Sequence, residues 1–406
     1  MMLKIWHITE MFFFVYLAFT DIYLFIFAVS GLFPLKRDQK AVRKKRKIQV
    51  LIPGYREDAV ILDVAKEALR QDYGTENYDV VIIADGFLPE TIQKLKAIDV
   101  QVVEVKLECS TKSRALNAAL AQTSDDYDIA VVLDADNIMA KDFLTRINAA
   151  FCDGYLAVQG HRVAKNLDTP FAILDAVSEE MNNHIFRKGH RVLRLSSALI
   201  GSAMAFDYLY FKKMMKKVEV VGGFDKELEV RLLQKRHKIE YLPDAYVYDE
   251  KVPNAKVFTK QRRRWLSAQV HYFGKSFLPA LRDLFLHGNI DFFNKALQFI
   301  LLPRIMLISL LFVLTVIYFF AAPAATFYPV FGLFITAVLV FLLSIPPYFY
   351  NFRTLWALTR LPAGIALMFF SFLHLRGSNK EFLHTKHTYN AFQIKHPYFY
   401  PKNKKK

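Results

Sequence analysis

The chain has 406 residues, which is enough for one large domain or two ordinary ones. Its residues are 53% hydrophobic and 15% aromatic, which is high for a soluble protein of that length. The formal net charge is +16, but the basic residues cluster beside hydrophobic runs, at 36–47, 262–264 and 402–406. This placement favours a membrane surface with anionic headgroups over nucleic acid. Cys109 and Cys152 are too few and too far apart for a disulfide framework or a zinc site.

The first hydrophobic run, residues 11–33, predicts a membrane-spanning helix. Its length matches the hydrocarbon core, which about 20 helical residues can cross. The run lacks the small-residue cleavage site of a removed signal peptide. We therefore expect an N-terminal transmembrane helix within residues 1–35, followed by a basic linker over residues 36–47.

Residues 48–250 have the strand and helix pattern of an α/β domain. Short β-rich runs occur at 48–52, 80–84, 102–105 and 129–133, and a helix-like segment separates each run from the next. This alternation predicts a Rossmann-like parallel sheet covered by helices on both faces. Ligands of such sheets bind beyond the carboxyl ends of the strands, so the residues after each run are the candidates for function.

Polar and acidic residues follow three of these predicted strands. The first run leads into Pro53, Tyr55 and Glu57, the second into Asp85, and the fourth into Asp134 and Asp136. A single carboxylate after a strand is as often a helix cap or a turn residue as a functional group. Three such strand ends at one edge predict a shared site, where paired aspartates bind a divalent cation, Mg²⁺ or Mn²⁺, that neutralises a diphosphate.

Further motifs follow along the chain. They are Lys112 in Lys-Ser-Arg-Ala-Leu-Asn, Gly201 and Ser202 in Gly-Ser-Ala, Asp225 after Gly-Gly-Phe, and Gln261, Arg264 and Trp265 in Gln-Arg-Arg-Arg-Trp. A guanidinium fork suits phosphate oxygens, and an indole face packs on the apolar side of a sugar ring. Asp225 can accept a proton from a hydroxyl, and it can also cap the helix that follows it.

The order of these motifs resembles the family 2 glycosyltransferases over about residues 48–265. These are inverting enzymes with the GT-A fold of nucleotide-diphospho-sugar transferases, and the likeness is to their membrane-embedded branch, which includes cellulose, chitin and hyaluronan synthases. The resemblance implies that Asp85 binds the base or ribose side of the donor nucleotide. It implies that the segment of Pro53, Tyr55 and Glu57 embraces uridine, and that Lys112 contacts the donor diphosphate.

The resemblance also assigns the metal site and the catalytic base. Asp134 and Asp136 match the Asp-x-Asp motif, with Asp136 as the direct metal ligand. Asp225 falls where the family has its base, which takes the proton of the acceptor hydroxyl. The chain departs from the family pattern at Gly223 and Phe224, where the family has Thr and Glu.

The acceptor and the leaving group are implied by two more motifs. Gly201 and Ser202 resemble the small-residue loop that an acceptor sugar approaches. Gln261, Arg264 and Trp265 match Gln-x-x-Arg-Trp, whose Arg holds the departing diphosphate and whose Trp stacks beneath the acceptor. This motif predicts interfacial helices over residues 251–303.

Two more spans are predicted within residues 304–346, at 305–322 and 327–345. Residues 347–376 carry Arg360 and Pro362, and we expect an interfacial or re-entrant helix there. Residues 377–406 form a basic tail, which the positive-inside rule places in the cytoplasm, so that the N-terminus lies outside. Within this tail, residues 382–387 resemble a gating loop of some synthases.

We therefore expect a multi-pass protein of the inner cell membrane with a cytoplasmic catalytic domain. Its function would be to move a sugar from a nucleotide-diphosphate donor, UDP-linked by the resemblance, onto a growing polysaccharide. One alternative is the transfer of a single sugar to a lipid-linked acceptor. An alternative of another class is a protein that binds or transports nucleotide sugars without catalysis. Export of a polymer would need a homo-oligomer or an export partner, and no nucleic acid partner is expected.

Overall fold

The computed structural model describes residues 2–36, 44–218, 223–251, 255–321 and 323–361, without the side chains of residues 2–7 and 255–262. The predicted gating loop at 382–387, the basic tail, and most of the linker at 36–47 lie outside the described residues. Three helices in the described part are long and apolar enough to cross a membrane, and they cover Ile8–Ser30, Arg304–Ala321 and Ala324–Ser344.

An eight-stranded sheet with the order β3-β2-β1-β4-β7-β6-β8-β5 forms the centre of the α/β domain. The strands are β1 (Ile48–Tyr55), β2 (Tyr78–Asp85), β3 (Gln101–Val105), β4 (Ile129–Val132), β5 (Ile138–Met139), β6 (Ala157–Ala164), β7 (Met204–Asp207) and β8 (Ile239–Asp249). The four strands expected from the sequence, β1 to β4, are parallel neighbours. The sheet as a whole is mixed, because β7 runs antiparallel to both β4 and β6 and so reverses its direction.

Helices cover both faces of the sheet, as the alternation of strands and helices predicts. One face packs on α2 (Ile61–Ala68), α3 (Pro89–Lys96) and α5 (Phe143–Cys152), and the other on α4 (Lys112–Gln122), α8 (Tyr208–Met215) and α9 (Phe224–Gln234). Successive side chains of a strand point to opposite faces, so Val50 joins the first core and Leu51 the second. A parallel strand that is buried on both faces therefore reads as a continuous apolar run.

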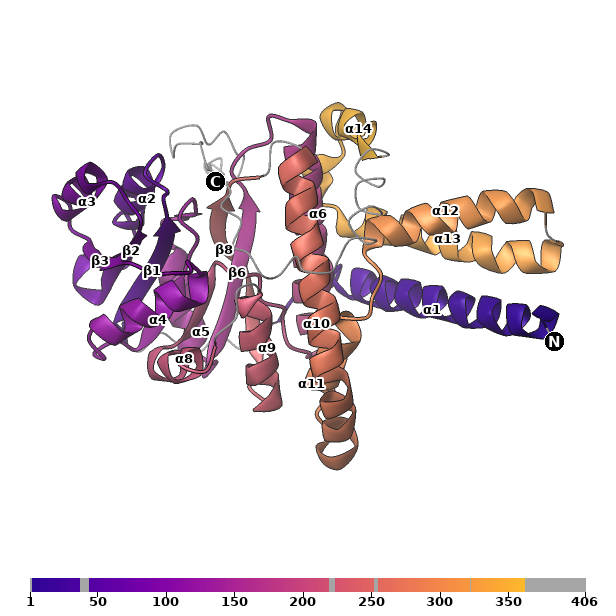
Figure 1. The fold of residues 1–406 in the computed structure, drawn as a ribbon, viewed down its shortest axis with the longest axis horizontal. Coiled ribbons are helices and arrows are strands. Elements are labelled where there is room, and N and C mark those ends of the chain that lie inside the picture. The colour runs from indigo at the N-terminus through magenta and orange to yellow at the C-terminus, as the bar shows by residue number, and fades with distance from the viewer. Residues whose placement is uncertain (1, 37–43, 219–222, 252–254, 322, 362–406) are drawn as a thin grey trace, which may run out of the picture.

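The three described helices that could cross a membrane, called the membrane helices below, lie side by side and project away from the sheet (Figure 1). They are α1 (Met2–Ser30), α12 (Arg304–Ala321) and α13 (Ala324–Ser344). The long helix α10 (Ala255–His287) and the shorter α11 (Ile290–Gln298) run across their direction, between these helices and the sheet (Figure 1). This orientation suits a helix that lies along a membrane surface.

The remaining elements connect these two parts. They are η1 (Thr75–Asn77), α6 (Pro170–Asn182), a π-helical segment η2 (Asn183–Gly189), α7 (His190–Val192), η3 (Pro347–Phe349) and α14 (Phe352–Leu358). Helix α6 begins at Pro170, directly after its N-cap residue Thr169, whose side chain accepts a hydrogen bond from the backbone N–H of Ala172 at 3.1 Å. Helix α6 packs against α14 and, more lightly, against α13, so it lies beside the membrane helices.

A buried polar contact joins α1 to the α/β domain. The Tyr23 hydroxyl donates to Asn294 Oδ1 at 2.8 Å and lies 3.0 Å from His190 Nε2. His190 stacks on Phe27 at a ring distance of 3.7 Å. Burial lowers the pKa of His190 to about 3, so its ring is neutral. Because His190 Nδ1 lies 2.7 Å from Ile185 O, Nδ1 carries the ring proton and Nε2 is an acceptor.

We expect Tyr23→Phe to destabilise the protein by about 1 to 3 kcal/mol, because it leaves the buried Asn294 Oδ1 without its donor. Thermal unfolding of the purified chain in nanodiscs measures the effect as a lower unfolding temperature. Tyr328→Phe is the matched control, because Tyr328 lies on a membrane helix and is 66% exposed. An equal unfolding temperature for both variants would contradict this role of Tyr23.

Candidate active site

The ends of β2, β1 and β4 lie next to one another, which brings the predicted donor residues to one edge of the sheet. Tyr55 is paired with Asp85 in the register of β1 and β2. The backbone N–H of Arg56 donates to Asp85 O at 3.0 Å, so the loop after β1 folds over the end of β2. A Cβ atom at Gly54 would lie 2.6 Å from the Phe87 ring, and this close approach explains the glycine.

Asp85 is buried at this edge, with 5% of its surface exposed. Burial raises the pKa of the Asp85 carboxyl, and the hydrogen bond from Ser110 and the charge of Arg56 oppose the rise. The Ser110 hydroxyl donates to Asp85 Oδ2 at 2.5 Å. Lys112 follows two residues later at the start of α4, where the Thr111 side chain caps the helix. Asp85 and Lys112 are therefore linked through one short segment.

Three carboxylates form a compact acidic cluster beyond the strand ends. Oxygens of Asp134, Asp136 and Asp249 lie within 4.8 Å of one another. Asp136 Oδ2 accepts from the backbone N–H of Glu250 at 2.8 Å, and the Asn137 side chain donates to both Asp136 and Asp249. These bonds fix the orientation of the carboxylates. An all-oxygen set of this size fits a hard divalent cation such as Mg²⁺ or Mn²⁺.

Cationic side chains surround the acidic cluster. Arg162 Nη1 lies 3.4 Å from Asp249 Oδ1 and 3.7 Å from Asp134 Oδ2, and Arg162 Nε donates to Glu179 Oε1 at 2.7 Å. Lys251 binds both Asp249 and Glu179. Burial alone would raise the pKa of Glu179, but the charges of Arg162 and Lys251 hold it well below its usual range. Glu179 is therefore ionised and holds both cations beside the acidic cluster.

Asp225 lies opposite Gly201 at the start of α9. Gly201 has φ +88°, and a Cβ atom there would lie 3.9 Å from Asp225 Cγ. Lys112 Nζ donates to Gly201 O at 2.8 Å and also binds the Asp134 carboxylate. Lys112 Nζ further lies 5.4 Å from the centre of the Phe224 ring. The aromatic residue that departs from the family pattern thus packs against the predicted phosphate contact.

The Arg264 side chain lies near both Asp134 of the acidic cluster and Asp225. Burial lowers the pKa of Arg264, and the charges of Asp225 and Asp134 oppose the shift, so its guanidinium lies within range of both carboxylates. Arg264 and Trp265 follow each other on α10 and line the same cavity as Asp134 and Asp225. One cleft is therefore lined by the predicted base, by Asp134 of the metal-site motif and by the Arg-Trp pair.

This cavity has a volume of about 1270 Å³. The predicted site residues that line it are Lys112, Asp134, Gly201, Asp225, Arg264 and Trp265. The other predicted residues described with side chains are not in its lining, and they are Pro53, Tyr55, Glu57, Asp85, Asp136 and Ser202. Gln261 belongs to α10, but its side chain lies outside the described residues.

The structure contradicts the interpretation of Ser202 as an acceptor contact. Ser202 is fully buried, and its Oγ accepts from Arg162 Nη1 at 3.3 Å. Its carbonyl accepts from the Gln159 side chain at 3.0 Å. Because the chain turns sharply between Gly201, at φ +88°, and Ala203, at φ +52°, Gly201 faces the cavity and Ser202 faces the sheet. Ser202 therefore stabilises the loop through hydrogen bonds on the side that faces the sheet.

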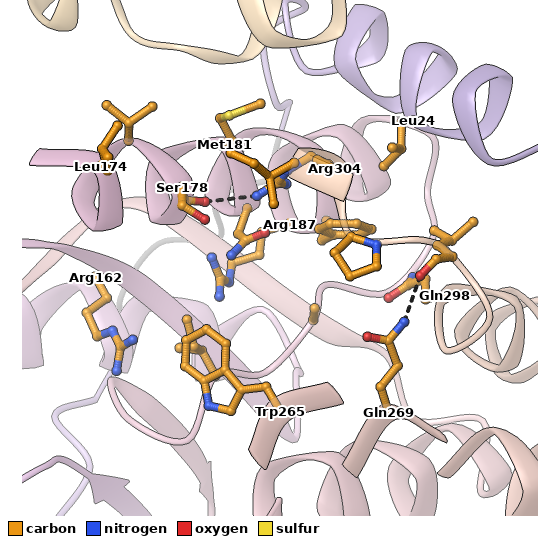
Figure 2. A pocket seen from close by; sticks show the side chains of 18 of the residues that line it. Leu24, Arg162, Leu174, Ser178, Met181, Arg187, Trp265, Gln269, Gln298 and Arg304 are labelled. Carbon is orange, nitrogen blue, oxygen red and sulfur yellow. Dashed lines mark hydrogen bonds between the residues drawn. The ribbon is translucent and has the colours of Figure 1, made fainter. Parts of the chain in front are cut away.

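The cavity extends from the catalytic end toward the membrane helices. Its far end is lined mostly by apolar side chains of α6, α12, α13 and α14, which include Leu174, Met181, Ile308, Phe341 and Leu355, with Ser178, Asn182 and Thr354 among them. Figure 2 shows Trp265 and Arg162 on one side of this space and Leu174 and Met181 on the other. The site is therefore polar at the sheet and apolar at the helices that could cross a membrane.

Sequence reasoning missed Asp249 and Arg162. Asp249 ends β8 directly after the apolar run 245–248, so the rule that found Asp85 and Asp134 applies to it as well. Arg162 lies in β6, and no local pattern distinguishes it from a surface arginine. Its role depends on Glu179 of α6, which only the folded chain places beside it.

Comparisons with known proteins agree with this geometry. The family described as "Glycosyltransferase like family 2" matches residues 45–268, more than half of the chain. The probable glycosyltransferase YdaM of Bacillus subtilis is 24% identical over 233 residues, 54% of each chain. The beta-monoglucosyldiacylglycerol synthase of Synechocystis is 26% identical over 230 residues, 53% of this chain and 46% of the relative. The chain thus spans about half the length of these curated relatives.

A solved structure resembles nearly the whole chain. The mannosyltransferase PcManGT from Pyrobaculum calidifontis, in complex with GDP-Man and Mn²⁺, has a TM-score of 0.57 at 17% identity. The likeness covers 90% of this chain and 96% of that chain, and it shows the fold. With the family match over residues 45–268, we conclude that the chain belongs to glycosyltransferase family 2 and has a GT-A fold with apolar helices attached.

Proposed function

We propose that this protein is a metal-dependent inverting glycosyltransferase that moves a sugar from a nucleotide-diphosphate donor to a lipid-linked acceptor in the membrane. The observation that carries the proposal is the shared cavity. It begins at Asp134, Asp225 and Arg264 and ends in an apolar space between α6, α12, α13 and α14. A donor can thus bind at the sheet while the hydrocarbon of an acceptor lies among the membrane helices.

The reaction is a single displacement. The oxygen of an acceptor hydroxyl attacks the anomeric carbon of the donor sugar, and the bond from that carbon to the diphosphate oxygen breaks. The nucleoside diphosphate leaves with the bonding electron pair, and the Asp225 carboxylate takes the hydroxyl proton. Arg264 and Lys112 stabilise the negative charge that develops on the diphosphate. Trp265 supports the acceptor, and Gly201 leaves room beside Asp225.

Asp134, Asp136 and Asp249 would hold a divalent cation, and when bound it supplies positive charge against the donor diphosphate. Mn²⁺ is present in the PcManGT complex, and we propose the same class of ion here, Mg²⁺ or Mn²⁺. Asp136 is the direct ligand by the resemblance of its motif, and Asp249 adds a third carboxylate. Arg162 and Lys251 form ion pairs with Asp249 and so place positive charge beside this set.

The donor nucleotide would bind at the edge formed by β1 and β2. Asp85 takes the base or ribose side, and the loop with Pro53, Tyr55 and Glu57 closes on the base. Glu57 accepts backbone hydrogen bonds from Val60 at 3.2 Å and Ile61 at 3.1 Å, so this loop is tied to the start of α2. The resemblance implies uridine, and a panel of UDP-linked and GDP-linked sugars tests the choice of base.

The proposed acceptor differs from the growing polysaccharide that the sequence alone predicts. A growing polysaccharide needs a polar path, because its hydroxyl groups must be hydrogen-bonded when they leave water. The far end of the cavity is instead lined by side chains such as Leu174, Ile308 and Phe341. The name of the Synechocystis relative describes the synthesis of a glucosylated diacylglycerol, and an acceptor of this class suits an apolar end.

The protein would be a multi-pass protein of the inner membrane, with the α/β domain in the cytoplasm and the N-terminus outside. A transport function has one feature in its favour. Asp21 is a fully buried carboxylate of α1, and such residues often mark substrate paths. Asp21 is not among the described residues that line the cavity, whereas Asp225 and Arg264 are, so catalysis is the better account.

Labelled donor and a membrane lipid extract, incubated with the purified chain, should give a single lipid-extractable product. A ladder of polymer sizes would instead support polysaccharide synthesis.

Asp225→Asn should lower kcat by about 10²- to 10⁴-fold, because the base is lost while the shape of the side chain is kept. Unchanged product formation by Asp225→Asn would rule out the assigned base and favour a different site.

Asp249→Asn should raise the Mn²⁺ concentration for half-maximal activity by at least about tenfold. The increase in unfolding temperature with added Mn²⁺ should weaken in parallel, which gives a readout independent of turnover. Asp142→Asn is the control, because Asp142 pairs with Arg146 away from the cavity. A metal response equal to that of the unaltered chain would exclude Asp249 from the metal site.

Ser110→Ala should make donor binding more sensitive to acid. The Ser110 hydrogen bond lowers the pKa of Asp85 against the effect of burial, so its loss lets that pKa rise further. The Asp85 carboxylate then becomes protonated at a higher pH, and the fall in donor affinity on acidification begins earlier. The measurement is donor KM against pH. Ser124→Ala, which removes an exposed hydrogen bond to Asp126, should leave the dependence of donor KM on pH unchanged.

A further inference from the structure

Arg187 is a buried cation of the cavity that the reaction does not use. It lies in the π-helical segment η2, directly after α6, and only 3% of its surface is exposed. Its Nη1 donates to Asn183 Oδ1, while its Nε has no hydrogen-bond partner among the described residues. Burial lowers the pKa of Arg187, so the folded chain holds this charge at a cost.

No carboxylate of the described chain forms an ion pair with Arg187. Glu179 attracts it at a distance, but Glu179 already binds Arg162 and Lys251. Arg162 in turn repels Arg187. The two carboxylates in the cavity lining, Asp134 and Asp225, belong to the catalytic end. Among the described residues Arg187 therefore has no ion-pair partner, and π-helical segments of this kind are frequent at functional sites.

A second arginine faces the same part of the cavity. Arg304 is the first residue of α12, and its Nη2 donates to Ser178 O of α6 at 3.1 Å. Its guanidinium lies 5.8 Å from the Phe186 ring centre, beside η2. In Figure 2, Arg187 and Arg304 lie between Trp265 and the apolar residues. The two guanidinium groups thus stand where the polar end of the cavity meets its apolar end.

We propose that Arg187 and Arg304 bind a phosphate group of the acceptor lipid. This inference rests on the proposed transfer to a lipid, and it adds the chemical class of that lipid. Guanidinium groups bind phosphate oxygens through paired, charge-assisted hydrogen bonds. The acceptor hydroxyl would then lie at Trp265 and Asp225, its phosphate at the two arginines, and its hydrocarbon among α6, α12 and α13.

The donor diphosphate does not account for these arginines. Lys112 and Arg264 already stand at the acidic cluster, where the diphosphate and its cation would bind. Arg304 is instead fixed to α6 and to the start of a membrane helix. Two sources offer a phosphate, a free hydroxyl and hydrocarbon in one molecule, namely a glycerophospholipid with a hydroxylated headgroup and a sugar linked to an isoprenoid through a diphosphate. A neutral glycerolipid offers no phosphate.

The experiment compares matched acceptors with the full chain in detergent. Dioleoylglycerol is the neutral acceptor, and dioleoylphosphatidylglycerol and farnesyl-diphospho-N-acetylglucosamine carry both phosphate and free hydroxyl groups. At least one phosphate-bearing lipid should be used with a kcat/KM about 10- to 100-fold above that of dioleoylglycerol. Mild alkali, which deacylates glycerolipids, and mild acid, which cleaves isoprenoid phosphates, then identify the source from the labelled product.

Arg187→Gln should raise the KM for the phosphate-bearing acceptor at least about tenfold and leave the KM for the donor unchanged. Arg187→Lys keeps the charge and should retain part of the affinity, and Arg304→Gln should act in the same direction. Arg70→Gln, which breaks an exposed pair with Glu67, is the control. An unchanged donor KM also demonstrates that the variants are folded. If Arg187→Gln does not fold, the Arg304→Gln variant and the comparison of acceptors test the proposed phosphate site instead.

Two results separate this inference from the proposed function. Equal use of dioleoylglycerol and the phosphate-bearing lipids, with no effect of Arg187→Gln or Arg304→Gln on acceptor KM, would overturn the phosphate site and leave lipid transfer intact. A polymer ladder with no transfer to any of the three lipids would overturn both proposals. Preference for a phosphate-bearing lipid that is lost in Arg187→Gln supports both.

Discussion

Three carboxylates within 4.8 Å repel one another, and the site depends on how the fold offsets that repulsion. Asn137 and the backbone N–H of Glu250 orient the oxygens of Asp136 and Asp249. Arg162 and Lys251 supply positive charge and are themselves held by Glu179. The cluster therefore stays compact, as a site for a hard cation requires, while Asp134 remains accessible from the cavity.

The same network positions the acceptor side of the site. Arg162 Nη1 lies beside Asp134 and Asp249 and also donates to the Ser202 hydroxyl, so it connects the metal residues to the loop that carries Gly201. Glu179 lies on α6, and α6 also forms part of the wall of the apolar space. A single helix thus links the chemistry at the sheet with the surface that faces the membrane helices, and a shift of α6 would disturb both.

The polarity of the cavity lining matches the successive parts of the proposed lipid acceptor. Carboxylates and cations stand at the sheet, Trp265 follows, Arg187 and Arg304 come next, and aliphatic and aromatic side chains close the far end. The order suits a molecule with a reactive hydroxyl, a charged linkage and a hydrocarbon tail. The family match covers residues 45–268 and so includes the sheet but not α12, α13 and α14. In the proposed function these apolar helices therefore select the acceptor.

The sequence by itself determined the local elements and the edge at which they act. Strands β1 to β4, the three candidate spans, and the carboxylates at strand ends follow from periodicity and from where apolar runs stop, which are properties of neighbouring residues. Only the tertiary structure decided the reversal of β7, the role of Arg162, the burial of Ser202 and the cavity. These depend on contacts between segments far apart in the chain, such as β6 with β8 and α6 with α14, which no local pattern encodes.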